Sequence, residues 1–162
     1  MPLEESHLWL SITMEGFEEF MLASEWTSYQ RDEATLGWVT SAYGDGLTGY
    51  DMCEHVKNWL RQTSNDSYSL CEVLLRQGSP HVKRGPDCFA SHVQLLPIGR
   101  FLDTLVEAPT HFPLSMPMVP FYWIDYACLR QCQADFKLPL IRDLVNRVGV
   151  TLVELDERHE SI

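Results

Sequence analysis

The clearest hydrophobic pattern in the chain is an alternation of short apolar runs and amphipathic segments in its C-terminal half. Short apolar runs that are bounded by turn or acidic residues are typical of strands buried in a parallel sheet. Segments in which apolar residues recur every three or four positions are typical of helices. The pattern predicts strands over residues 87–92, 121–126 and 150–155, with helices over residues 98–106 and 138–148 between them.

A strand–helix–strand alternation predicts that the strands pair in parallel. Each helical crossover lies on a face of the sheet, and such crossovers are right-handed almost without exception. The proline-rich residues 109–120 are predicted to form a loop between the first helix and the second strand. We therefore predict an α/β domain over residues 85–162, with helices on both faces of a three-stranded sheet.

The N-terminal half shows helical patterns only. Residues 3–23 place apolar side chains at mostly helical spacing, which predicts one or two short helices. Two further amphipathic helices are predicted over residues 52–62 and 67–76, and the polar, glycine-containing residues 24–50 are predicted to form a linker or surface wrap. Residues 1–84 are thus predicted to be a helical extension that packs on the α/β domain.

Composition and charge exclude several classes of protein. The 162-residue chain is 45% hydrophobic, enough for a folded core, and its net charge of −11 repels nucleic-acid backbones. There is neither a signal peptide nor a run of 18 apolar residues, so no membrane span is predicted and a cytoplasmic location is expected. The odd number of five cysteines, placed in predicted helices and strands, favours reduced thiols.

Two segments carry a resemblance to a known family. Residues 85–92, GPDCFASH, resemble the first strand of a TIR-like family of protist proteins, in which that strand ends in Phe-Val-Ser-His. Residues 121–133, FYWIDYACLRQCQ, are similar to the second strand of the same family and to fungal heterokaryon-incompatibility domains, which carry a Trp-Ile-Asp…Cys…Gln pattern. The resemblance covers residues 49–156 and implies part of a flavodoxin-like parallel sheet, with strand order 2-1-3.

The sequence departs from the family pattern in two places. Val93 and Gln94 stand where the family usually has Ala-Trp. The family also continues past the third strand to a helix bearing Trp-Cys-x-x-Glu, whose glutamate is catalytic in members that cleave NAD, and this motif is not present. The resemblance therefore implies a domain truncated after its third strand, without an assigned catalytic residue.

In an open parallel sheet, ligands bind beyond the carboxyl ends of the strands. With the family-like strand order, this rule selects Ser91, His92, Asp125 and Asp156 as candidate ligand-binding residues, and Gln131 of the loop after the second strand is a further candidate. Structural alternatives stay open: Ser91 and His92 can satisfy backbone groups, Asp125 can accept hydrogen bonds from the following loop, and Gln131 can orient that loop or be an exposed surface residue.

The cysteines suggest two further sites that the spacing does not favour. Cys88, His92, Cys128 and Cys132 lack the paired spacing usual in zinc sites, so no metal is predicted. A nucleophilic Cys128 activated by His92 requires the two side chains to be within hydrogen-bonding distance, which sequence alone does not establish.

Two functions follow from the resemblance. The first is a signalling or scaffold module that binds protein partners, including copies of itself, through the unpaired edge of the strand from Val150 to Leu155. The second is an NAD-cleaving hydrolase, with NAD as substrate and no bound cofactor. A third hypothesis, an inactive fragment of such an enzyme, follows from acidic residues 154–160 at the place where the family has a hydrophobic helix.

Overall fold

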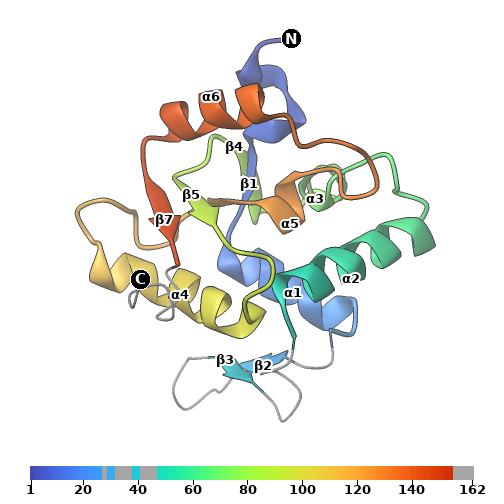
Figure 1. Ribbon diagram of the computed structural model, residues 1–162, viewed down its shortest axis with the longest axis horizontal. Coiled ribbons are helices and arrows are strands. Elements are labelled where there is room, and N and C mark those ends of the chain that lie inside the picture. Colours follow the sequence, from blue (N-terminus) through green and yellow to red (C-terminus); the bar gives the residue numbers. More distant parts are fainter. Residues whose placement is uncertain (27–28, 32–37, 41–46, 155–162) are drawn as a thin grey trace.

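A five-stranded mixed sheet forms the centre of the protein (Figure 1). The computed structural model describes residues 1–26, 29–31, 38–40 and 47–154. The strand order of the sheet is β4-β1-β6-β5-β7, and a separate two-stranded sheet pairs β2 with β3. The predicted mixed α/β class is confirmed.

The three strands predicted in the C-terminal half lie next to one another. They are β5 (Cys88–Ser91), β6 (Tyr122–Ile124) and β7 (Thr151–Val153). β5 lies between the other two and runs parallel to both, with Phe89 opposite Trp123 on one side and opposite Thr151 on the other. The Phe89 and Trp123 rings stack at a centroid distance of 4.7 Å, so neighbouring strands share one packed face.

Two strands from residues 1–84 complete the sheet and correct the prediction of a purely helical N-terminal segment. β1 (Leu10–Ile12) pairs antiparallel with β4 (Val82–Arg84) on one side and with β6 on the other. All three residues of β1 are buried, because the strand lies between two others. A three-residue strand is too short to show the alternation of apolar and polar residues that identifies a strand. The two 3-10 turns that precede β1, Leu3–Glu5 and His7–Trp9, also make the sequence pattern look helical.

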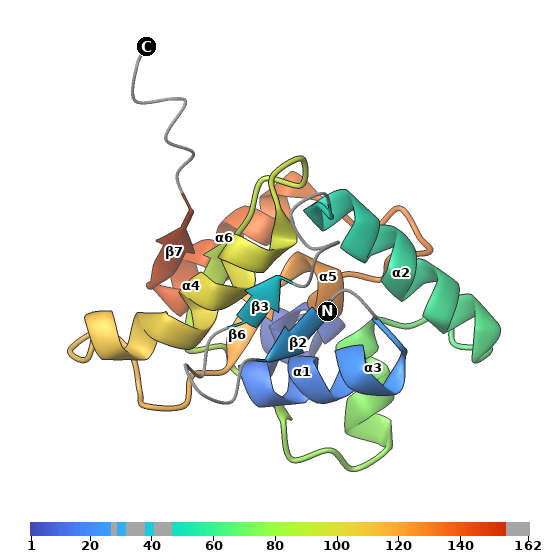
Figure 2. The ribbon, with the colours of Figure 1, turned by 90° about the horizontal axis from the view of Figure 1, so that it is seen from below.

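The helices lie on both sides of the sheet. In Figures 1 and 2, α6 (Leu138–Val148) lies on one side, while α1 (Met14–Ala23) and α4 (Ile98–His111) lie on the other. α2 (Gly49–Gln62) and α3 (Leu70–Arg76) each begin with a capping box, formed by Thr48 with Asp51 and by Ser69 with Glu72. None of the helices within the described ranges is long and apolar enough to cross a bilayer.

α4 continues past its predicted end and contains Pro109, which the sequence placed in a loop. A proline has no N–H to donate to the carbonyl four residues earlier, here that of Leu105. The buried hydroxyl of Tyr122 donates to this carbonyl at 2.7 Å. A side chain of β6 therefore replaces the missing backbone hydrogen bond and allows the helix to include the proline.

Residues 24–50, predicted as a linker, contain regular structure. β2 (Tyr29–Arg31) and β3 (Trp38–Thr40) form an antiparallel pair in which Gln30 lies opposite Val39. The predicted linker also includes residues 27–28, 32–37 and 41–46, which lie outside the described residues.

Candidate functional site

A polar cleft lies beyond the carboxyl ends of β5 and β6. Its volume is about 360 Å³, and α2 forms one of its walls. His92 and Gln94 follow β5, and Asp125 directly follows β6 as the first residue of the short helix α5 (Asp125–Cys128). The remaining lining residues are Tyr50, Cys53, Glu54 and Lys57 from α2 and Leu129, Arg130, Gln131, Gln133, Asp135 and Phe136 from the segment after α5.

Three of the five predicted site residues, His92, Asp125 and Gln131, line this cleft. Ser91 lies in β5 opposite Val153, and it is not one of the residues that line the cleft. Asp156 lies outside the described residues. The rule that ligands bind at strand ends thus brought most of the predicted residues to one place.

Asp125 carries the cleft's most perturbed carboxyl group. Its Oδ1 accepts a hydrogen bond from the Tyr126 backbone N–H at 2.8 Å, and its Oδ2 accepts one from the Gln94 amide at 3.4 Å. Burial raises the pKa of Asp125 to about 6, although these hydrogen bonds act in the opposite direction. The carboxyl group is therefore able to change its protonation state just below neutral pH.

His92 is held as a neutral imidazole beneath the cleft. Its side chain is fully buried, its ring stacks on Phe101 at a centroid distance of 4.4 Å, and its Nδ1 lies 2.5 Å from the Tyr126 hydroxyl. Its Nε2 faces the Glu154 carboxylate at 3.6 Å. Burial lowers the pKa of His92 to about 4, so the ring is uncharged at neutral pH.

The His92–Tyr126 pair requires a glycine at the start of α2. A Cβ atom at Gly49 would collide with the Tyr126 hydroxyl oxygen and would lie 2.8 Å from His92 Nδ1. Only a residue without a side chain lets the helix approach this closely. Gly49 therefore sets how tightly α2 closes over the strand ends.

Gln131 acts as an orienting residue in this structure. Its amide nitrogen donates to the carbonyls of Asp125 at 2.5 Å and Leu129 at 3.3 Å. Both carbonyls belong to α5 or its end, so the side chain holds the helix and the following loop together. Of the two alternatives left open for Gln131, this one matches the observed contacts.

Several residues in or beside the cleft were not among those predicted from the sequence. Glu154 does not line the cleft but faces His92, and it directly follows β7 as Asp125 follows β6. The predicted third strand ended two residues later, so the same strand-end rule selected Asp156 in place of Glu154. For Cys53 and Lys57 no sequence signal exists, because nothing in the pattern of α2 shows which part of the sheet it covers.

The hypothesis of a Cys128 nucleophile activated by His92 fails on geometry. The Cys128 thiol lies 3.7 Å from the Cys71 thiol and donates to the Leu10 carbonyl at 3.4 Å, whereas His92 contacts Tyr126. Cys128 is therefore not placed as a nucleophile that His92 activates. Cys53 borders the cleft, but burial, together with the Asp125 charge, raises its pKa to about 12 and keeps its thiol protonated.

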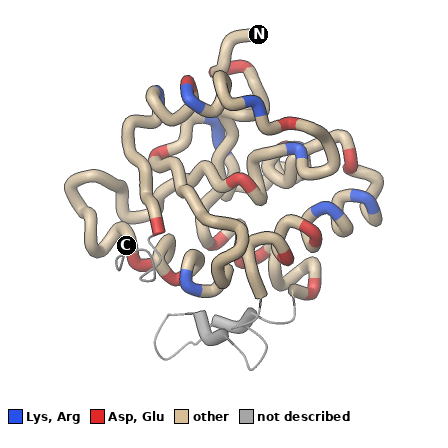
Figure 3. The backbone as a smooth tube through the Cα atoms, in the orientation of Figure 1, with Lys and Arg blue, Asp and Glu red and all other residues tan. Residues whose placement is uncertain are grey.

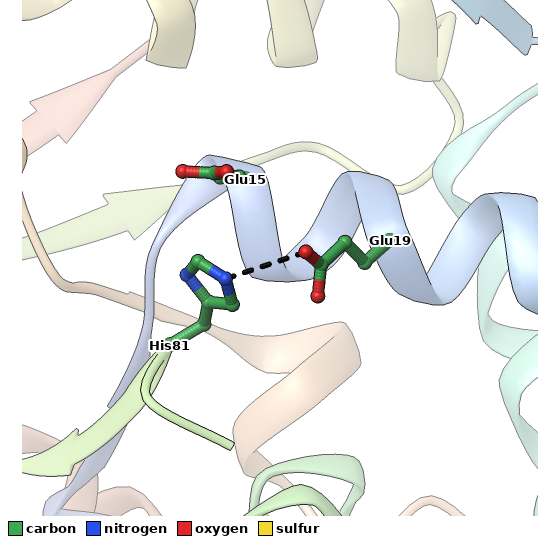
Figure 4. A group of neighbouring side chains, drawn as sticks. All are labelled: Glu15, Glu19 and His81. Atoms are coloured by element: carbon green, nitrogen blue, oxygen red, sulfur yellow. Dashed lines mark ion pairs between the residues drawn. The ribbon is translucent and has the colours of Figure 1, made fainter.

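One group of potential metal ligands occurs among the described residues, and it lies away from the cleft (Figure 4). Glu15 and Glu19 of α1 and His81 place their ligand atoms within 4.8 Å of one another. His81 Nε2 pairs with Glu19 at 3.4 Å, and its Nδ1 lies 3.1 Å from the Thr13 hydroxyl. Both glutamates are exposed, and exposed acidic groups commonly gather in this way without an ion.

The lysine and the arginine that border the cleft each pair with an acidic residue. Lys57 pairs with Glu54 at 3.3 Å, and Arg130 binds both carboxylate oxygens of Glu72, at 2.8 and 3.1 Å. With the Asp125 carboxyl, the glutamine amides and two aromatic rings, the cleft can bind a small polar ligand that contains a planar group.

The fold and the cleft define an α/β protein with a polar site at the ends of parallel strands. A comparison with protein-family models, curated proteins and solved structures gives no match. The TIR-like assignment therefore rests on residues 85–92 and 121–133 and stays a prediction.

Proposed function

We propose that the chain is a TIR-like module that acts by association with protein partners, including copies of itself, through the outer edge of β7. The order β6-β5-β7, with all three strands parallel, supports a flavodoxin-like arrangement of this part of the sheet. Helices on both sides of the sheet are in keeping with it. The two antiparallel strands are an addition on the far side of β6.

The observation that carries this proposal is the unpaired edge of β7. The Val150 carbonyl accepts a hydrogen bond from Phe89 N–H at 2.8 Å and so points towards β5. Because backbone groups alternate along a strand, the N–H and C=O of Thr151 and Val153 point to the other side, where none of the described residues forms a strand. Unpaired strand edges recruit strands of other chains.

The test is the oligomeric state of the full chain over a range of concentrations. Light scattering on a sizing column should show association that increases with concentration. Val153→Pro removes an outward N–H without removing a hydrogen bond to β5, and it should shift the protein to monomer. Val153→Thr keeps the N–H and should associate as the wild type does. A wild type that is monomeric at all concentrations contradicts the proposal.

A second candidate function is cleavage of NAD in the cleft, and the placement of Asp125 favours it. Hydrolysis of a glycosidic bond needs a carboxyl group beside the sugar, and Asp125 is a partly buried carboxyl group that lines the cleft at the strand ends. Incubation with NAD should then release nicotinamide, and Asp125→Asn should abolish the release. Val153→Pro should leave it unchanged, which separates this function from association.

A further inference from the structure

An open groove with apolar and acidic side chains lies between α1 and α4. Figure 2 shows these two helices on the same side of the sheet. The volume of the groove is about 410 Å³. Leu22 of α1 and Val106 of α4 contribute its walls, Tyr122 of β6 lies at its base, and Met118 and Val119 enter from the segment that precedes β6. The groove is distinct from both the polar cleft and the edge of β7.

Large apolar side chains are exposed in this groove. Leu22 is 65% exposed, Met118 85% and Val119 64%. One exposed apolar residue is ordinary, but several that converge on one concave surface indicate a binding surface. Methionine adapts its shape to different partners, which suits Met118 and its neighbour Met14 to this role.

The charged side chains that line the groove are acidic. They are Glu15, Glu18 and Glu19 of α1, and no lysine or arginine occurs among the lining residues that the structure describes. Glu15 and Glu19 are four residues apart and so lie about one turn apart on the same face of α1, where Figure 4 labels both. Figure 3 marks the acidic residues of the described chain in red. The three glutamates repel anionic lipid, and they attract basic side chains more strongly than the acidic surface of a second copy. The complementary partner is a basic one.

We infer that this groove binds a basic amphipathic helix of a protein partner. A groove between two helices accepts a helix whose apolar residues recur at positions i, i+3, i+4 and i+7. The ten residues of α1 span about 15 Å, so the bound segment is about as long as α1 itself. Lysine or arginine residues flank its apolar stripe and face the three glutamates.

The test uses the full chain and two synthetic peptides of the length of α1. Both contain the same number of leucine and lysine residues. In the first peptide the leucines follow the i, i+3, i+4, i+7 pattern, and in the second they are dispersed around the helix. Fluorescence anisotropy should show at least about tenfold tighter binding of the first peptide. Equal affinities overturn the inference, because charge alone then explains the binding, and so does the absence of binding up to about 1 mM.

Two pairs of matched variants locate the site. Met118→Asp should weaken binding of the patterned peptide about tenfold, whereas Leu114→Asp, at a fully exposed residue of the same segment outside the groove, should not. Glu15→Gln with Glu18→Gln should weaken it more than Asp66→Asn with Asp143→Asn, which changes the net charge equally. Equal weakening within either pair overturns the inference.

Measurements of self-association test whether a second copy of the chain, rather than a basic helix, occupies the groove. If Met118→Asp abolishes concentration-dependent association and Val153→Pro does not, the groove binds a second copy of this chain and the inferred basic partner is wrong. Far-UV circular dichroism of Met118→Asp is expected to match that of the wild type, since the side chain is exposed.

Discussion

The two sides of the five-stranded sheet differ in how they are built and in what they carry. On the parallel side, β6 and β5 end at the polar cleft, so the topology gathers Asp125 and His92 at one place. On the antiparallel side, β1 and β4 come from distant parts of the chain and run in opposite directions, so their ends do not converge on one edge. The parallel side thus positions the side chains of the cleft, while the antiparallel side packs against the parallel strands.

This packing includes polar contacts of the segment around β1. The Trp123 indole N–H donates to the Leu8 carbonyl at 3.0 Å, and the Ser11 hydroxyl donates to the Lys83 carbonyl at 2.9 Å. Ile12 is completely buried between β4 and β6. The parallel side therefore depends on residues from the N-terminal end of the chain for its own core.

The largest expected effect comes from separating the two sides. A fragment of residues 85–162 lacks β1 and β4, which exposes the long edge of β6 and the apolar faces of Tyr122 and Trp123. We expect this fragment to be unfolded or aggregated, as measured by circular dichroism and proton NMR. Co-expression with residues 1–84 should restore folded protein. A fragment that folds alone would confirm the domain boundary predicted at residue 85 and would contradict the dependence described above.

One substitution on each side of the sheet compares how much each side contributes to the free energy of unfolding. Ile12→Ala removes a completely buried side chain from a strand with neighbours on both sides and should lower the free energy of unfolding by about 3 kcal/mol. Leu152→Ala, in the half-buried edge strand β7, should cost about 1 kcal/mol. Urea unfolding measures both. Equal losses would show that β1 is no more central to stability than β7.

The parallel side could be predicted from the sequence because strands and amphipathic helices alternate regularly along that part of the chain. Crossover helices with clear apolar faces separate β5, β6 and β7, and the apolar runs of β5 and β6 are buried as predicted. β1 and β4 have only three residues each, and their pairing joins residues about 70 positions apart, a contact that local patterns do not encode. Tertiary packing, rather than the local sequence pattern, therefore makes the segments of β1 and β4 strands.

The site was predictable to the extent that it follows from strand ends. His92 and Asp125 were found because each comes immediately after a strand that the sequence defined well. Glu154 was missed because the end of β7 was placed too late, and strand boundaries are the least certain part of such a prediction. The wall that α2 contributes depends on how helices pack, which no residue spacing within α2 specifies.

Two ionisable groups at the strand ends, Asp125 and His92, should give opposite pH dependences of stability. Asp125 has a pKa of about 6 in the folded protein against an ordinary value of 3.8, so between these values the folded state binds more protons than the unfolded state. Its contribution to stability therefore falls as pH rises from about 4 to 6. His92 has a pKa lowered from 6.5 to about 4, so its contribution rises with pH over the same interval.

When either group is substituted, the free energy of unfolding should vary with pH according to the group that remains. The free energy of unfolding of Asp125→Asn should rise with pH more steeply than that of the wild type, and that of His92→Asn less steeply, by about 1–2 kcal/mol between pH 4 and 6. Urea unfolding across this interval measures the slopes, with Asp66→Asn on the exposed surface as control. Parallel slopes for all the variants would show that neither group is desolvated as described.

The smallest effect is expected from one of the polar links between the N-terminal and C-terminal parts, the contact of Arg130 with Glu72. Burial raises the pKa of Glu72, but the hydrogen bonds from Arg130 and from the Ser69 backbone outweigh it and leave the pKa below its ordinary value. Arg130→Lys keeps the charge and loses the two-pronged geometry, so it should lower the free energy of unfolding by about 0.5–1 kcal/mol. Urea unfolding should show this difference shrinking in about 1 M salt, because ions screen a partly exposed pair. A loss as large as that of Ile12→Ala would instead mean that charge, rather than the buried strand β1, joins the two parts of the molecule.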